Sequence, residues 1–117
     1  MDLLLLSNST LPGESFLQWP RPHIQSFLGE GRKRLAFVPF AAVSFSMDEY
    51  TANVRGAFAE MGHDLFSLHT EADKVKALEQ ADGVVVGGGN TFQLLRTLYS
   101  TELLRAIRRR VQNGMPY

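Results

Sequence analysis

Three consecutive glycines, Gly87–Gly89, form the stretch of this chain best suited to chemistry. They follow the β-branched run Val84–Val86 and precede Asn90 and an apolar-periodic segment that begins at Phe92. The apolar run is typical of a strand buried on both faces of a parallel sheet, and Asn90 is a favourable helix N-cap. The sequence therefore predicts a strand, a bare-backbone loop and a helix. Such loops lie at the carboxyl edge of open α/β sheets, where ligands bind.

The loop does not match either of two known phosphate-binding motifs. A dinucleotide fingerprint that starts at Gly87 needs glycine where Phe92 stands, and a P-loop that starts at Gly83 needs lysine where Gly89 stands. Exposed N–H donors beside a helix N-terminus also suit a carboxylate or a developing oxyanion. The alternative is a tight strand-to-helix turn that binds nothing, and the loop alone leaves both interpretations open.

Polar side chains at other expected strand ends are candidates for lining the same site. These are Ser7, Asn8, His69 and Thr91. His69 is the one histidine expected at this edge, and no histidine has metal-ligand spacing to another histidine or carboxylate, so no metal site is expected. No base is recognisably paired with a hydroxyl. The residues therefore indicate a scaffold with an electrophilic loop, and no nucleophile is recognised in this chain.

The elements that must position this loop alternate along the chain. Strands are expected at Leu3–Leu6, Leu35–Val38, Leu65–Leu68 and Val84–Val86, with Met115–Tyr117 as the first residues of a fifth. Helices are expected between them: a broken one restarting near Pro22, and others from Ser46, Thr70–Asp73, Asn90 and Ser100. This alternation predicts a doubly wound, mostly parallel α/β sheet sandwiched by helices, flavodoxin-like, with Val84–Val86 in a central position.

Composition excludes several classes of protein. The 117 residues make at most one domain, and twelve basic residues balance twelve acidic ones, so nothing global attracts nucleic acid or an anionic membrane. The arginine cluster within Arg105–Arg110 is interpreted as a solvated helix face. There is no cysteine and no run near the ~18 apolar residues of a membrane span. A soluble, cytoplasmic protein is the expectation.

Four motifs then carry a resemblance that covers the chain from Met1 to Tyr117. Leu3–Gly13, Val38–Ala41, Asp48–Thr51 and Val86–Leu95 resemble the peptidase E family of α-aspartyl dipeptidases. The resemblance implies an α/β sandwich related to class I glutamine amidotransferases. It implies a cytoplasmic serine peptidase that hydrolyses dipeptides with an N-terminal aspartate through an acyl-enzyme. No metal or organic cofactor is needed for that reaction.

The resemblance also assigns roles within and beyond the chain. It implies that Gly87, Gly88, Gly89 and Asn90 supply oxyanion-hole N–H groups and line the substrate site. The catalytic serine, histidine and acid are expected after Tyr117. Residues 1–117 are thus expected to be the N-terminal half of a single α/β hydrolytic domain, inactive and poorly stable alone. Because the strand after the last helix has barely started, the apolar face of that helix is expected to stay partly in water: Leu103, Leu104, Ile107 and Val111. The expected partners are a small dipeptide and the remainder of the same protein, with a homodimer as an option.

Two other functions stay open. A related cyanophycinase-like or amidotransferase-like hydrolase would share the glycine loop and the scaffold. A non-catalytic ligand-binding fragment would need no nucleophile. A serine elbow after Tyr117 would support a hydrolase, and a stop codon there would support the binding module.

Overall fold

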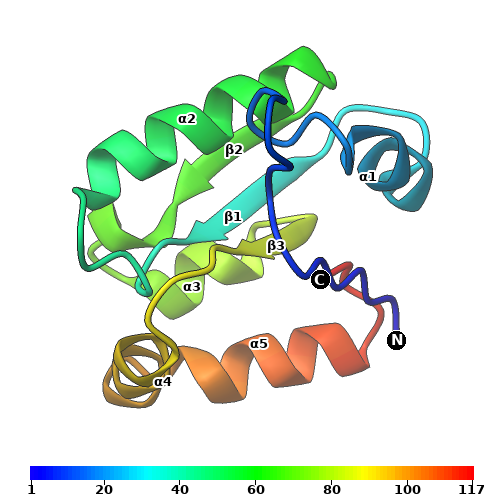
Figure 1. Ribbon diagram of the computed structural model, residues 1–117. Coiled ribbons are helices and arrows are strands. Elements are labelled where there is room, and N and C mark those ends of the chain that lie inside the picture. Colours follow the sequence, from blue (N-terminus) through cyan, green and yellow to red (C-terminus); the bar gives the residue numbers. More distant parts are fainter.

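The computed structural model describes residues 1–117 as helices and strands in alternation (Figure 1). The elements in chain order are α1 (Arg21–Leu28), β1 (Arg34–Val38), α2 (Met47–Glu60), β2 (Asp64–Ser67), a 3₁₀ helix η1 (Leu68–Thr70), α3 (Lys74–Glu79), β3 (Gly83–Val86), α4 (Thr91–Ser100) and α5 (Leu103–Gln112). No helix is long and apolar enough to cross a membrane.

The sheet has three parallel strands in the order β2-β1-β3. Leu35 of the middle strand is level with Leu65 of β2 on one side and with Gly83 of β3 on the other. The central position predicted for Val84–Val86 is therefore wrong, because β1 is the middle strand and β3 lies at the edge. Beyond β3 only a short contact continues the ladder, from the Val84 N–H to the Pro116 C=O at 2.9 Å.

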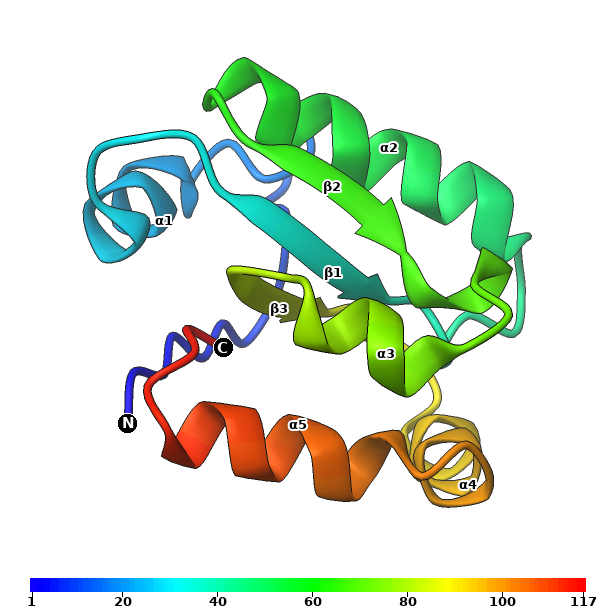
Figure 2. The same cartoon turned by 180° about the vertical axis from the view of Figure 1, so that it is seen from behind.

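Helices cover both faces of the sheet. Helices α1 and α2 lie on one face, and α3, α4 and α5 lie on the other (Figures 1 and 2). Alternate residues of β1 point to opposite faces. Phe37 packs in the core with Phe58 of α2, and Val38 packs in the core with Leu78 of α3. This two-sided arrangement confirms the predicted doubly wound α/β fold.

Most predicted helix starts are confirmed by their caps. The Ser46 hydroxyl accepts the Glu49 N–H at 3.0 Å at the start of α2, and Pro22 lies in the first turn of α1. The start predicted at Ser100 is wrong, because Ser100 is the last residue of α4. The Thr101 hydroxyl donates to the Thr97 C=O at 2.6 Å, so it completes the end of α4 and does not begin α5.

The strand predicted at Leu3–Leu6 is not present as a strand. This segment is extended past the edge of the sheet, and Leu5 is 73% exposed. Its one ladder partner is Tyr117, which donates to the Asp2 C=O at 3.0 Å and accepts from the Leu4 N–H at 2.8 Å. Four leucines favour burial, but a strand is defined by its hydrogen-bonded neighbours. Leu3–Leu6 has a single hydrogen-bonded neighbour, Tyr117, so it does not form a strand.

The apolar face of α5 is buried, contrary to the expectation that part of it would stay in water. Leu103, Ile107 and Val111 are all at most 7% exposed, and the helix packs against α3. Arg110 ties the two elements together by donating to the Leu78 C=O at 3.0 Å and the Ala81 C=O at 2.9 Å. The arginine cluster is thus partly structural and not only a solvated face.

Candidate active site

The glycine loop lies at the carboxyl end of β3, between that strand and α4. Both ends of the loop are hydrogen-bonded to the end of β1 and the residues that follow it. The Gly87 N–H donates to the Val38 C=O at 3.0 Å, and the Asn90 N–H donates to the Ala41 C=O at 2.9 Å. The N–H groups of Gly88 and Gly89 make no backbone hydrogen bond, and both residues are exposed. Of the four predicted donors, the two middle ones are therefore not used by the backbone, and the Gly88 N–H lies near the Tyr50 hydroxyl.

The three glycines differ in the space around them. A Cβ on Gly89 would lie 2.4 Å from the Ala41 carbonyl oxygen, and the φ of Gly89 is 141°. A Cβ on Gly87 would lie 2.5 Å from the Tyr50 hydroxyl oxygen. A Cβ on Gly88 would meet nothing within 4 Å. Close packing therefore explains the outer two glycines, whereas Gly88 faces open space.

That open space is a cavity of about 540 Å³ at the carboxyl edge of the sheet. Gly87 and Gly88 form part of its wall, together with the predicted Ser7 and Asn8. Gly89, Asn90, His69 and Thr91 are not among its lining residues. Its other polar walls come from Ser9, Tyr50 and Asn53, and no acidic or basic side chain lines it. This half of the site can offer neutral hydrogen bonds, but it has no charge to pair with a substrate's charge.

Tyr50 is the site residue that the sequence reasoning missed as a functional candidate. Its ring makes edge contacts with Phe37 and Phe45 at centroid distances of 5.1 and 5.0 Å. Burial raises the pKa of the Tyr50 hydroxyl, and the nearby Gly88 N–H partly offsets that rise. The hydroxyl is therefore neutral at physiological pH and can both donate and accept. The available signal was its place in the first turn of a helix that begins at the ligand edge.

The Ser7–Ser9 turn is held over the cavity by contacts from the segment before α1. The Trp19 indole N–H donates to Asn8 Oδ1 at 2.8 Å, and the Leu17 N–H donates to the Ser9 C=O at 3.0 Å. The Asn8 amide oxygen is therefore already used, and its NH₂ group remains for a ligand. Trp19 acts as more than a packing residue, since it orients a cavity side chain.

His69 takes part in a separate cluster at the end of β2. Its Nε2 lies 2.7 Å from Asp48 Oδ1, and its Nδ1 contacts the Ser67 hydroxyl. These three residue types resemble a serine-peptidase triad. However, Ser67 is 2% exposed, and its hydroxyl also accepts the His69 N–H at the start of η1. A substrate carbonyl cannot reach it, so this cluster is a structural cap.

Asn90 has its side chain committed to α4. Its Oδ1 accepts the Gln93 N–H at 2.9 Å, as the N-cap interpretation predicts. Since its backbone N–H is also bonded to Ala41, Asn90 fixes the loop and has no free backbone donor, although its side-chain NH₂ group remains. Its predicted contact with substrate stays a prediction.

Comparison with known proteins identifies the family of this chain. The model of peptidase family S51 matches residues 3–117. The chain belongs to peptidase family S51. Among its relatives, peptidase E of Streptomyces coelicolor is 47% identical over 117 residues, covering 100% of this chain and 47% of that protein. Peptidase E of a Nostoc species is 45% identical over 115 residues, covering 98% of this chain and 48% of that protein.

A solved structure has the same fold as this chain. A Listeria monocytogenes protein provisionally named peptidase E superposes with a TM-score of 0.70 at 25% identity, covering 83% of this chain and 50% of that one. The chain thus spans about half the length of the curated relatives it matches.

Proposed function

We propose that this chain is the N-terminal half of a serine-type dipeptidase that hydrolyses dipeptides with an N-terminal aspartate. Membership of family S51 and relatives named peptidase E support hydrolysis of peptides. The observation that carries the proposal is the pair of exposed N–H groups at Gly88 and Gly89, neither of them bonded to a backbone carbonyl, beside a cavity at the carboxyl edge. Such donors stabilise the negative charge that develops on a carbonyl oxygen under attack.

The proposed reaction is acyl transfer in two steps. A serine hydroxyl supplied by polypeptide beyond Tyr117 attacks the scissile carbonyl carbon, and its proton passes through a base to the leaving amine. Water then attacks the ester carbonyl and releases aspartate. The residues of this chain contribute the oxyanion donors, and Tyr50 and Asn8 contribute neutral hydrogen bonds.

Selection of aspartate is proposed to depend on residues outside this chain. The substrate's ammonium group and side-chain carboxylate both need counter-charges, and the cavity walls described here carry none. The oxyanion donors would thus come from this chain, and the charged residues that select aspartate would come from another part of the same protein.

Activity of the complete protein against two dipeptides tests this function. Asp-Leu is expected to be hydrolysed, while Leu-Leu, of similar size, is not. Equal turnover of both would contradict the aspartate specificity, and turnover of neither would favour the non-catalytic fragment. Trapping of an acylated serine by mass spectrometry would distinguish the serine mechanism from direct attack by water.

A further inference from the structure

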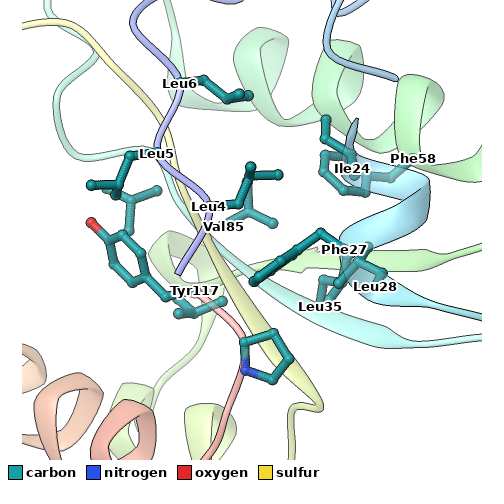
Figure 3. Close-up of a pocket in the computed structure, with 13 residues that line it drawn as sticks. Leu4, Leu5, Leu6, Ile24, Phe27, Leu28, Leu35, Phe58, Val85 and Tyr117 are labelled. Atoms are coloured by element: carbon teal, nitrogen blue, oxygen red, sulfur yellow. The ribbon is translucent and has the colours of Figure 1, made fainter. Parts of the chain in front are cut away.

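Two cavities open beside β3, and they offer a substrate different chemistry. The first is a slot of about 250 Å³ along the outer edge of the strand, and apart from Tyr117 every residue that lines it has an apolar side chain (Figure 3). The second is the cavity of about 540 Å³ at the carboxyl edge, which Gly88 and Tyr50 help to line. A carbonyl oxygen that gains negative charge needs hydrogen-bond donors, so it belongs in the second cavity.

The glycine loop presents one backbone donor to this second cavity. Gly87 and Gly88 line the cavity, whereas Gly89 does not. The Gly87 N–H already donates to the Val38 C=O, which leaves the Gly88 N–H. An oxyanion accepts several hydrogen bonds at once, so a single N–H leaves room for a further donor.

The Tyr50 hydroxyl lies beside that N–H. A Cβ on Gly87 would be 2.5 Å from the hydroxyl oxygen, so the hydroxyl lies against the peptide that joins Gly87 to Gly88. The Gly88 N–H is near enough to influence the pKa of the hydroxyl. Because Tyr50 also lines the cavity, a ligand oxygen that accepts from the Gly88 N–H becomes a neighbour of the hydroxyl.

Packing holds the Tyr50 ring in this position. The ring meets Phe37 at an interplanar angle of 89° and Phe45 at 72°, with centroids 5.1 and 5.0 Å away. Its backbone belongs to the first turn of α2, where the Tyr50 N–H donates to the Ser46 C=O at 3.1 Å. The hydroxyl can therefore change from accepting to donating by rotation about its own C–O bond, while the ring stays in place. A donor already in position needs little reorganisation during the reaction.

We infer that Tyr50 is a catalytic residue whose hydroxyl donates a hydrogen bond to the oxyanion, alongside the Gly88 N–H. In the empty site the Gly88 N–H lies near the hydroxyl oxygen. When a substrate carbonyl enters, its oxygen accepts from the Gly88 N–H, and the Tyr50 O–H rotates to donate to the same oxygen. The inference rests on the proposed serine-peptidase function, because it concerns the oxyanion that forms in that reaction.

The Tyr50 proton stays on its oxygen throughout the reaction. Attack by the serine oxygen forms a C–O bond and moves the π electron pair of the carbonyl onto its oxygen, where the Tyr50 O–H meets it. When the intermediate collapses, that pair reforms the C=O bond and the C–N bond to the leaving amine breaks. Burial raises the pKa of the Tyr50 hydroxyl, which favours the protonated donor at physiological pH.

A phenylalanine substitution in the complete protein tests the role of the hydroxyl. Tyr50→Phe keeps the ring and its contacts with Phe37 and Phe45 and removes only the hydroxyl. Its kcat for Asp-Leu is expected to fall about 10²–10³-fold, as for loss of one oxyanion donor, while KM stays unchanged. Tyr99→Phe removes the same group from a residue of α4 that is 69% exposed, so it is expected to change neither constant.

Binding of two ligands to the same variant separates the oxyanion from the bound substrate. The α-aldehyde of aspartate forms a hemiacetal with the serine, and its affinity is expected to weaken by the same factor as kcat. The affinity for the product aspartate, which also reports that the variant is folded, is expected to stay unchanged.

The outcomes distinguish this inference from the proposed function. Near-normal kcat in Tyr50→Phe would overturn the inference and leave the peptidase function intact. A raised KM at unchanged kcat, or equal weakening of both ligands, would assign Tyr50 to ground-state binding and also overturn it. An unaltered protein that hydrolyses neither Asp-Leu nor Leu-Leu would refute the proposed function, and the inference with it.

Discussion

Gly88 is the one position of the glycine loop where a side chain fits without a clash, because a Cβ there would meet no atom within 4 Å. Gly88→Val in the complete protein is therefore expected to leave the fold intact while its side chain projects toward the free N–H groups. Loss of one oxyanion donor lowers kcat about 10²–10³-fold. Steady-state kinetics with Asp-Leu and a thermal unfolding curve measure the two effects.

Gly89→Ala provides the contrast for that experiment. Its Cβ would lie 2.4 Å from a backbone oxygen of Ala41 at a φ of 141°, so it is expected to destabilise the protein as well as impair activity. A folded Gly88→Val variant with near-normal kcat would show that the loop is only a turn.

Gly87 and Tyr50 are expected to be energetically coupled. Gly87→Ala places a methyl group 2.5 Å from the Tyr50 hydroxyl and 2.7 Å from its ring, so it should destabilise the native protein. In a Tyr50→Leu background the same change should be milder, because leucine does not reach that point. A double-mutant cycle in urea should give a coupling of about 0.5–3 kcal/mol. Additive effects would mean that the loop moves away from the tyrosine freely.

At the scale of residues, the sequence could predict which residues lie at the carboxyl edge of the sheet, but not which of their side chains contact one another. Asn90 as a cap follows from local spacing, and the structure confirms it. Tyr50 lies 37 positions before Gly87, and only the packing of α2 over β1 and β3 brings them together. No local pattern contains that contact, so the sequence alone does not single out Tyr50 as a site residue.

At the scale of elements, helices and interior strands were predicted well because their signals are local. Capping side chains, apolar periodicity and terminal glycines all lie within a few residues of the boundary they define. The strand predicted at Leu3–Leu6 is wrong because its formation depends on a hydrogen-bonded partner more than a hundred positions away. The central position predicted for Val84–Val86 is wrong for the same reason. On its outer side β3 is hydrogen-bonded only to residue 116, which is also distant in the sequence.

The junction between α2 and β2 is expected to make stability depend on pH through His63. This histidine is 4% exposed, and its Nδ1 accepts the Lys33 N–H at 3.1 Å. Burial lowers its pKa, the Lys33 charge lowers it further, and Asp64 partly opposes both. Below about pH 6.5 the unfolded chain binds a proton that the folded chain resists. The free energy of unfolding should therefore fall as pH decreases from about 7 toward the lowered pKa.

A matched pair of variants isolates that contribution. His63→Asn keeps an acceptor for the Lys33 N–H without a titrating group, so its urea midpoint should change less between pH 7.5 and 5.5 than that of the unaltered protein. His23→Asn makes the same substitution at an exposed histidine and serves as the matched control. The same slope in all three proteins would assign the dependence to other groups.

At the scale of the whole molecule, residues 1–117 alone are predicted to be inactive and of low stability. The reason is not the exposed face of α5 that the sequence suggested, since that face is buried. It is the open edge of β3 and the leucines beside it, of which Leu5 is 73% exposed. Equilibrium urea unfolding should show a shallow or low-midpoint transition, and Asp-Leu should not be hydrolysed. A cooperative, monomeric transition with several kcal/mol of stability would contradict this.

The hydrogen bonds between Asp2, Leu4 and Tyr117 have a consequence for the order of events on the ribosome. Asp2 and Leu4 are synthesised before their partner Tyr117, which does not exist while the 112 residues between Leu4 and Tyr117 are made. At about 5–20 residues per second, that delay is roughly 6–22 s. The β1–α2–β2 unit has its partners within one stretch of chain and can form during this time. The side chains of Leu3–Leu6 therefore stay in water until residue 117 has been made. During that time they are accessible to a chaperone that binds nascent chains.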